Sequence, residues 1–437
     1  MKTFKYILLG LSLTLGVACQ PDLYEIVDND FASDKVKYVE TKSSTNILYA
    51  NNLNEFEAAF NYFDIITYTV KDFEITEEGD SVLVTSEQTD TVRLKVDKVP
   101  AERVSYYDGN NNKLDFPLQA GSGSEGILEV YAKVGDVLSE DPLLVQVVEE
   151  RAAYEEVIMP VVFHMIESEG YDMIEITKED IDKVVNRLNV VYNNPSYRGA
   201  NSGNANVKFM LAQYTPDGQV MTEAGINRTR SNYNGSDLAP KLVTSAEFTE
   251  WSPAHYLNIW VCTALPNTML PEDVLTSVGE ENWLRGLPNL VEYNTIEEVI
   301  QAEKVAEDPM PGRLGVIVGA TYTSYTDVYN YVFNSFAWEK EVGTYLGLIN
   351  TSYSRTSDLV DGDIDYCADT YSYHAAYGTM LEKKSVEGHY YDSENVMDNL
   401  TTNKVISADQ VERIRWVLES CPSRQAWKSE FAFNGTK

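Results

Sequence analysis

Histidine is scarce in this chain. The sequence has only four, His164, His255, His374 and His389, and no two of them stand four positions apart. A zinc-hydrolase helix needs two imidazoles one turn apart, because residues i and i+4 share a helix face. The usual His-x-x-x-His zinc site is therefore excluded. We set aside the alternative of a site rebuilt from His374, His389 and Glu341 or aspartates.

Basic residues are also in short supply. Lys and Arg total 34 against 68 Asp and Glu, so the formal net charge is −34. A surface of this sign repels phosphate backbones, and we expect no nucleic-acid partner. Hydrophobic residues make up 43% and charged residues 23% of the chain, which is typical of a folded globular protein.

Long apolar runs are absent after the N-terminus, which argues against a transmembrane helix. The opening "MKTFKYILLGLSLTLGVAC" has two lysines, an apolar run over Tyr6–Leu15 and small residues before Cys19. This pattern predicts a secretory signal over 1–18. Its end resembles the bacterial lipobox, although Gly16 stands where Leu is usual. We expect an exported protein that is lipid-anchored at Cys19, most simply to the outer membrane; an ordinary cleaved signal is the alternative.

Cysteine is scarce as well, and Cys19 leaves three others. Cys262 ends the apolar run "YLNIWVC", where a free cysteine behaves as a small hydrophobic residue. Cys367 and Cys421 lie in the loop-like contexts "DYCADT" and "ESCPSR". In an oxidising envelope we expect these two to form a disulfide.

The first third of the mature chain includes a long stretch with the pattern of β-structure. An acidic segment over 19–46 predicts a tether, and 47–152 carries alternating runs such as "TVRLKVD", "ILEVYAKV" and "LLVQVV". Turn sequences ("EEGD", "YDGNNN", "GSGSEG") separate them. The spacing favours an immunoglobulin-like β-sandwich. Because it contains no histidine or cysteine, we interpret it as a spacer or interaction module.

The remainder, 153–437, changes character. A buried strand over Val157–His164 precedes a helix that Thr177 can cap, with Asp180 completing a capping box. Further strands are predicted at "NVKFMLAQY", "YLNIWVC" and "RLGVIVGA", and a second long helix at "NYVFNSFAWEKEVGTYLGL". A late helix, "SADQVERIRWVLESC", begins after Ser407. The expected fold is an α+β multidomain chain whose second domain has a mixed sheet and two main helices.

The stretch "KEVGTYLGLIN" (340–350) resembles the zinc helix HExxHxxGxxH of the metzincins. From about Val157 to Lys428 the chain is similar to the pappalysin/cytophagalysin branch of that family, as found in Bacteroidetes lipoproteins. The segments that carry the resemblance are "MPVVFHMI", "DIDKVVNRLNVVYNN", "VKFMLAQYTPDGQVMTEAGINR", "YLNIWVC", "ENVMD" and "SADQVERIRWVLESCPSRQAW". The resemblance implies a metallopeptidase domain, with Met397 at the Met-turn and Glu341 at the general-base position.

All three metal-ligand positions depart from this pattern. Lys340, Thr344 and Asn350 stand where the family has histidine. A protonated lysine has no lone pair to donate, and hydroxyl and carboxamide groups are weak zinc ligands. We therefore expect no cofactor at the zinc position. One hypothesis is that the Lys340 ammonium replaces the metal and neutralises Glu341; the alternative is that Glu341 faces water.

The acidic stretch "SDLVDGDIDYCADTY" suggests a second cation site. Asp361, Asp363 and Asp365 could wrap oxygens around Ca²⁺, and the family often holds calcium near this loop. The stretch lacks the twelve-position EF-hand layout, and an exposed acidic loop is the alternative.

Taken together, the sequence favours a catalytically inactive pseudo-protease that binds a peptide or protein. One alternative is an active zinc metalloendopeptidase with non-standard ligands. A second is an adhesive or structural surface protein in which the β-sandwich carries the function.

Overall fold

The computed structural model describes most of the chain between residues 35 and 436. The described ranges are 35–42, 47–75, 81–96, 99–168, 176–193, 201–232, 250–262, 315–319, 329–330, 336–353, 365–388, 390–401, 404–420 and 424–436. The predicted signal, Cys19 and most of the predicted tether lie outside these ranges.

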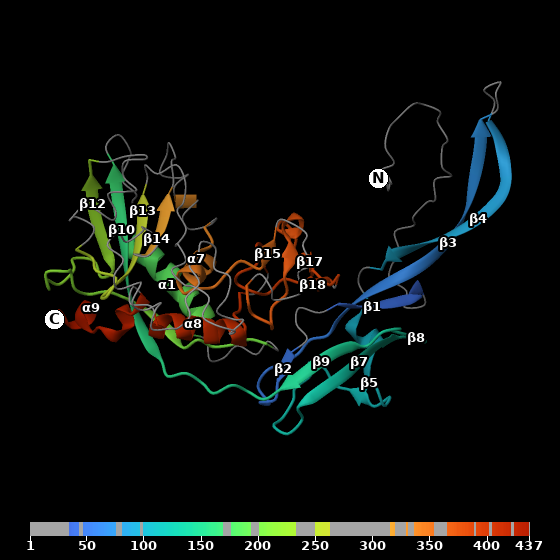
Figure 1. Cartoon of the computed structure of the whole chain (residues 1–437), viewed down its shortest axis with the longest axis horizontal. Helices are drawn as coiled ribbons and strands as arrows, with labels where there is room; N and C mark the ends of the chain where they lie inside the picture. The colour runs from blue at the N-terminus through green and yellow to red at the C-terminus, as the bar shows by residue number, and fades with distance from the viewer. Residues whose placement is uncertain are drawn as a thin grey trace, which may run out of the picture. The chain divides into compact units, whose positions relative to one another are not determined.

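The fold is a mixed α+β arrangement with many strands and few helices (Figure 1). The chain divides into two compact units. Unit 1 comprises 1–40, 60–114 and 130–142, and unit 2 comprises 41–59, 115–129 and 143–437. These units interleave along the sequence, whereas the predicted domains are continuous stretches, and the boundary at 152/153 remains a prediction.

Unit 1 is built from antiparallel strands. Its elements, some of which run into the next unit, are β1 (Tyr38–Lys42), β3 (Ala59–Ile75), β4 (Ser81–Lys95), the 3-10 turn η2 (Ala101–Arg103), β5 (Val104–Asp108), β6 (Lys113–Leu114), β7 (Gly126–Val134) and β8 (Val137–Leu138). β3 pairs with β4, and β5 pairs with β6 and β7. The alternation predicted for "TVRLKVD" is confirmed, because Val92, Leu94 and Val96 are less exposed than their neighbours. An immunoglobulin-like sandwich remains a prediction.

Unit 2 begins with two short paired strands and continues into a parallel sheet. β2 (Ile47–Tyr49) pairs in parallel with β9 (Leu143–Val148). The sheet follows the order β11-β10-β13-β14, and β12 also pairs with β10. Its strands are β10 (Val157–Ser168), β11 (Val207–Leu211), β12 (Ile226–Ser231), β13 (Leu257–Cys262) and β14 (Gly315–Gly319).

Every pairing described in this sheet is parallel; a mixed sheet over the whole domain remains a prediction. Parallel neighbours require crossover connections rather than hairpins. The helix α1 (Lys178–Tyr192) lies in the connection between β10 and β11. The alternation of apolar residues predicts which segments form strands, but not whether neighbouring strands run parallel or antiparallel.

The first predicted helix and the late helix form as predicted. Thr177 caps α1, and a capping box with Asp180 is present. The last long helix, α8 (Ala408–Ser420), follows Ser407, whose hydroxyl accepts a hydrogen bond from the Gln410 backbone N–H at 3.3 Å. Its predicted apolar stripe is buried: Val411, Ile414 and Leu418 are at most 6% exposed.

The main core lies between the sheet and the helices (Figure 1). Alternate residues of β10, such as Val161 and Phe163, pack with α1 and with α7 (Trp338–Tyr345). Val162 belongs to a smaller cluster with Trp251 and Tyr256. Burial of this kind contributes about 25 cal/mol per Å² of apolar surface.

Short elements complete unit 2. They are β15 (Ser352–Tyr353), β16 (Tyr373–His374), η6 (Ala375–Tyr377), β17 (Glu382–Lys384), β18 (Tyr390–Asp392), η8 (Ala426–Lys428) and α9 (Phe431–Asn434). None of the helices in the described ranges is both long and apolar enough to cross a membrane.

Candidate functional site

Helix α7 carries the candidate site. It covers Trp338–Tyr345, and its described part is shorter than the helix predicted from the sequence. Trp338, Val342 and Tyr345 are at most 1% exposed and anchor it in the main core. The Trp338 ring meets Phe163 of β10 at 5.7 Å between centroids. Because these residues occupy the inner face, Lys340, Glu341 and Thr344 remain only partly buried.

The helix ends at a glycine turn, as the motif predicts. Gly347 has φ 92°, in the left-handed region that favours glycine. Its N–H donates to Thr344 O at 2.9 Å, and the Leu348 N–H donates to Gly343 O at 2.9 Å. The chain then leaves the helix, and Asn350 is exposed.

Met397 lies directly against α7. A methyl group placed on Gly343 would lie 2.9 Å from Met397 Sδ and 2.6 Å from the Tyr192 hydroxyl, so only glycine fits there. Met397 is fully buried, and its N–H donates to Asn395 Oδ1 at 2.9 Å. The structure therefore brings together the helix and the methionine that the sequence placed at one site.

The three metal-ligand positions have other roles. Lys340 Nζ donates to Asn399 Oδ1 at 2.5 Å. The Thr344 hydroxyl donates to Lys340 O at 3.3 Å, one helical turn back. No hydrogen bond described in the structure joins Asn350 to Lys340 or Thr344. These side chains offer an ammonium, an engaged hydroxyl and an exposed carboxamide, which do not suit zinc.

Burial shifts the ionisation of both charged residues at the site. It lowers the pKa of Lys340 to about 8, although the charges of Glu341 and Asp398 oppose that shift. It raises the pKa of Glu341 to about 7, and the Lys340 charge opposes that shift. No direct ion pair joins Lys340 and Glu341. Only the through-space attraction between the two charges supports the hypothesis that the Lys340 ammonium neutralises Glu341, which remains a prediction.

Three residues beside α7 were not found from the sequence. Asp398 is buried, and its carboxylate accepts hydrogen bonds from the Thr351 hydroxyl and, at 2.7 Å, from the Ser393 hydroxyl. Burial raises its pKa. Asn399 holds Lys340, and Lys383 is a fully buried lysine nearby. Each follows or lies in an ordinary polar stretch, so only the position of Asp398 and Asn399 after Met397 could have drawn attention to them.

Glu339 is a buried anion on the same helix. Arg187 of α1 donates two hydrogen bonds to its carboxylate, from Nε at 2.7 Å and from Nη2 at 2.8 Å. Lys404 Nζ donates a third at 2.8 Å. Burial alone would raise its pKa, but these two cations hold the pKa below its usual value. The residue ties α7 to α1 and to the segment before α8.

Each of the three histidines that the structure describes has a hydrogen-bond partner within the fold. His164 is fully buried, its Nε2 lies 3.0 Å from Asn258 Oδ1, and burial lowers its pKa to about 4. The Nδ1 atom of His255 lies 2.6 Å from the Ser429 hydroxyl. His374 caps the η6 turn by accepting from the Ala376 N–H at 3.1 Å. His389 lies outside the described residues, so the rebuilt site remains untested.

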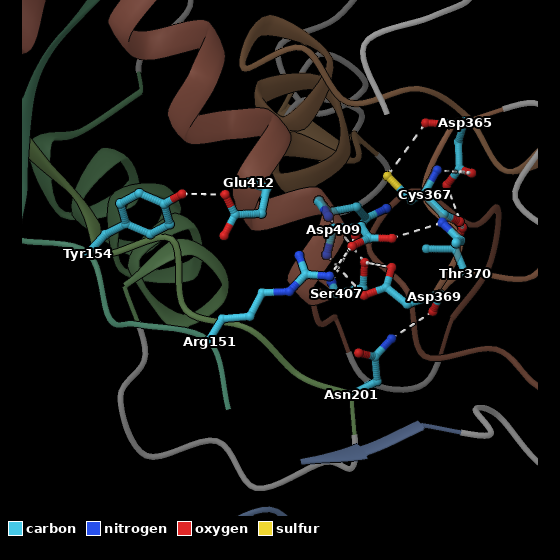
Figure 2. A network of polar contacts seen from close by, with 12 residues as sticks. Arg151, Tyr154, Asn201, Asp365, Cys367, Asp369, Thr370, Ser407, Asp409 and Glu412 are labelled. Carbon is cyan, nitrogen blue, oxygen red and sulfur yellow. Dashed lines mark hydrogen bonds and ion pairs between the residues drawn. The ribbon is translucent and has the colours of Figure 1, made fainter. Parts of the chain in front are cut away.

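Figure 2 shows where the acidic stretch enters the fold. Asp361 and Asp363 lie outside the described residues. Asp365 is buried and accepts hydrogen bonds within its own turn, from the Thr370 hydroxyl at 2.7 Å and the Cys367 N–H at 3.3 Å. Burial raises its pKa to about 8. The alternative of an exposed acidic loop is therefore wrong for Asp365, which is buried. Calcium binding by this stretch remains a prediction.

Asp369 connects this turn to α8 (Figure 2). Its carboxylate accepts from the Ser407 hydroxyl at 2.6 Å and from the Asp409 N–H at 2.9 Å. Asp409 in turn binds Arg151 and accepts from the Ala368 N–H at 2.9 Å. Burial, followed by the neighbouring Asp409 charge, raises the pKa of Asp369.

The predicted disulfide is not supported. Cys367 is a free, buried thiol whose Sγ lies 3.5 Å from Asp365 O, and burial raises its pKa. Cys421 lies outside the described residues. Cys262 is free and fully buried, as its apolar strand predicts.

Across the portion of the chain with described coordinates, no group of three or more histidine, cysteine, aspartate or glutamate residues is arranged to hold a metal ion. Asp361, Asp363 and His389 lie outside the described residues, so the calcium site and the rebuilt zinc site remain predictions.

Comparisons with known proteins give a limited result. No protein-family profile matches the chain, and no curated protein matches it. Among solved structures it is similar to mirolysin in complex with a compound, with 17% identity over 65% of this chain and 100% of that chain, at a TM-score of 0.35. It is also similar to mature Tannerella forsythia mirolysin with a cleaved peptide (16% identity, 65% and 100% covered, TM-score 0.34). A Tannerella forsythia promirolysin variant matches at 16% identity, with 64% and 86% covered and a TM-score of 0.33. At these values the likeness does not by itself assign an activity to this chain.

Proposed function

We propose that this chain is an exported, lipid-anchored protein whose second domain is a metzincin-like pseudo-protease. It binds a peptide or protein segment without zinc-dependent cleavage. The first domain, an immunoglobulin-like β-sandwich, serves as a spacer or an additional interaction surface. Lipid at Cys19 holds the protein to the outer membrane.

One observation carries this proposal: the framework of the helix is kept while its metal ligands are not. Gly347 still turns the chain after α7, and Met397 still packs beneath Gly343. At the same place Lys340 presents a cation that is already bonded to Asn399. A second cation would be repelled there, because two like charges at short range in a partly buried site cost free energy.

Metal analysis of the purified full-length protein tests the loss of the zinc site. We expect no stoichiometric zinc by elemental analysis after dialysis against trace zinc. An active enzyme with non-standard ligands requires about one zinc per chain, lost on Glu341→Gln or His389→Ala. That result would reverse the proposal in favour of the metallopeptidase alternative. The same analysis reports calcium at the acidic stretch.

Strand addition at β14 is the proposed mode of peptide binding. β14 ends the order β11-β10-β13-β14 among the described strands, and an extended peptide can add to such an edge through its backbone groups. Peptides N-methylated at alternate positions test this mode, since methylation removes the donors without changing the side chains. Equal binding of methylated and unmethylated peptides would exclude it.

The adhesive alternative assigns binding to the first domain. Deleting residues before 150 and measuring ligand capture separates the two proposals. Retained capture supports the second domain, and lost capture with an intact circular dichroism spectrum supports adhesion. For the anchor, Cys19→Ser is expected to release the protein from the membrane fraction.

A further inference from the structure

Lys383 is a lysine enclosed by backbone carbonyl groups. It lies in β17 and is 0% exposed. Its Nζ contacts four carbonyl oxygens, those of Tyr377 at 3.1 Å, Met380, Asn399 at 2.6 Å and Leu400 at 3.2 Å. The centroid of the Tyr373 ring lies 5.1 Å away. An ammonium has three donors and no acceptor, so its three N–H groups are shared among these four carbonyl oxygens.

These carbonyls come from two separate stretches of chain. Tyr377 and Met380 precede β17, whereas Asn399 and Leu400 directly follow the Met397 turn. Leu400 has φ 53°, in the left-handed region, so this turn is not held by backbone preference alone. The Lys383 ammonium therefore helps to join this turn to β17, which pairs antiparallel with β18.

Asn399 is fixed on three sides. Its N–H donates to the Tyr373 hydroxyl at 2.8 Å, and its carbonyl accepts from Lys383. Its side-chain Oδ1 accepts from Lys340 of α7. Two ammonium groups thus bracket this residue, one from the hairpin and one from the helix.

Asp398 supplies the negative charge for this arrangement. Its buried carboxylate attracts both lysines and so opposes the lowering of their pKa by burial. The Thr351 and Ser393 hydroxyls hold it in place. The cations and the anion form a polar cluster directly beside Met397.

We propose that the ammonium groups of Lys340 and Lys383 act as built-in cations that hold the 397–400 turn, Lys340 against α7 and Lys383 against β17, at the place where a metal-dependent helix would rely on a bound ion. The donor set fits this role and does not fit zinc. This inference goes beyond the proposed function, because it concerns how the site is held and requires no peptide ligand.

Cation rescue tests the proposal. In the full-length chain, Lys383→Ala vacates the carbonyl cage, whereas Lys383→Met fills the volume without a charge. Thermal unfolding is followed at constant ionic strength while ammonium or potassium chloride replaces choline chloride. We expect both variants to lose about 5 °C or more in Tm. Lys383→Ala should regain at least about half of its loss as ammonium rises, by mass action; Lys383→Met should regain none.

The neighbouring Lys384 provides the matched control. It lies in the same strand, partly exposed, with its Nζ 5.1 Å from the Tyr390 ring centroid. Lys384→Ala should leave Tm and its cation dependence unchanged. The proposal is overturned if Lys383→Ala responds to ammonium no more than Lys383→Met does, or if Lys383→Met is as stable as the natural chain.

A second measurement covers the case in which Lys383→Ala does not fold. Hydrogen exchange of the Asn399 amide is then compared between the natural chain and Lys340→Met. We expect at least about tenfold faster exchange in the variant, because the turn loses its tie to α7. Unchanged exchange at Asn399 would overturn the role of Lys340.

Discussion

Two buried charge clusters in unit 2 are built on opposite signs. Beside α7, the Lys340 and Lys383 ammonium groups are held by oxygen acceptors. Next to the start of α8, the Asp365 and Asp369 carboxyl groups are held by N–H and O–H donors. Both clusters fix a loop onto the fold. A chain of strongly acidic composition can thus place cations at its candidate site and buried acidic groups elsewhere.

The largest expected effect comes from emptying the cation cluster. Lys383→Met removes the donor shared by four backbone carbonyl oxygens. We expect the free energy of unfolding to fall by about 3–4 kcal/mol. Urea unfolding measures it, with Lys384→Met as control. A loss no greater than the control's would show that the two clusters are not comparable.

The anion cluster should respond less. Asp369→Asn keeps the size of the side chain but leaves only one acceptor for the Ser407 hydroxyl and the Asp409 N–H. We expect a loss of about 2 kcal/mol at pH 7 in urea unfolding. Asp392→Asn, at a half-exposed carboxylate that contacts Lys42, should change stability by less than about 0.5 kcal/mol. Equal losses would contradict the ranking.

The pH dependence of the free energy of unfolding should have opposite directions for the two clusters. Burial raises the pKa of Asp365 to about 8, from an ordinary value of 3.8. Between those values the folded state holds the proton more tightly, so this contribution is complete below about pH 4 and is lost by about pH 8. Asp365→Asn should therefore flatten a fall in stability of up to about 1.4 kcal/mol per pH unit. An unchanged slope would contradict the burial of this carboxyl.

The contribution of Lys340 to stability should change with pH in the opposite direction to that of Asp365. Burial lowers its pKa to about 8, from an ordinary value of 10.5. Between those values the unfolded state binds more protons, so the contribution of this residue to stability rises with pH. Lys340→Met should remove that rise in urea unfolding between about pH 8 and 10. A rise that persists in the variant would place its origin elsewhere.

The smallest effect is expected at a cap. Ser407→Ala removes the hydroxyl that donates to Asp369 and accepts from the Gln410 N–H. A loss of about 1 kcal/mol in thermal or urea unfolding is typical of such a cap. A markedly larger loss would mean that Asp369 depends on this hydroxyl more than on the Asp409 N–H.

Local patterns predicted the elements of the fold well. Thr177 and Asp180 lie three residues apart, and the stripe of Val411, Ile414 and Leu418 has helical spacing, so both helices follow from neighbouring residues. Met397 and α7 could be paired because a known motif links them. The parallel direction of the strands depends on crossovers, which strand patterns do not encode.

The charged clusters could not be predicted in the same way. Lys383 lies in "LEKKSVEG", where it resembles its partly exposed neighbour Lys384, and only the folded chain places carbonyl groups around it. Asp365 belongs to a run that resembles an exposed loop, yet it is 1% exposed. Burial of a charge depends on distant segments, so the sequence indicates candidate metal positions but not the groups that surround them.

Zinc titration by calorimetry tests whether the natural chain lacks a zinc site. The natural chain is compared with a Lys340→His, Thr344→His, Asn350→His variant, which restores the three imidazoles on the retained framework. We predict no saturable zinc binding for the natural chain and about one zinc per chain for the variant. Tight zinc binding by the natural chain at an equal stoichiometry would contradict the account.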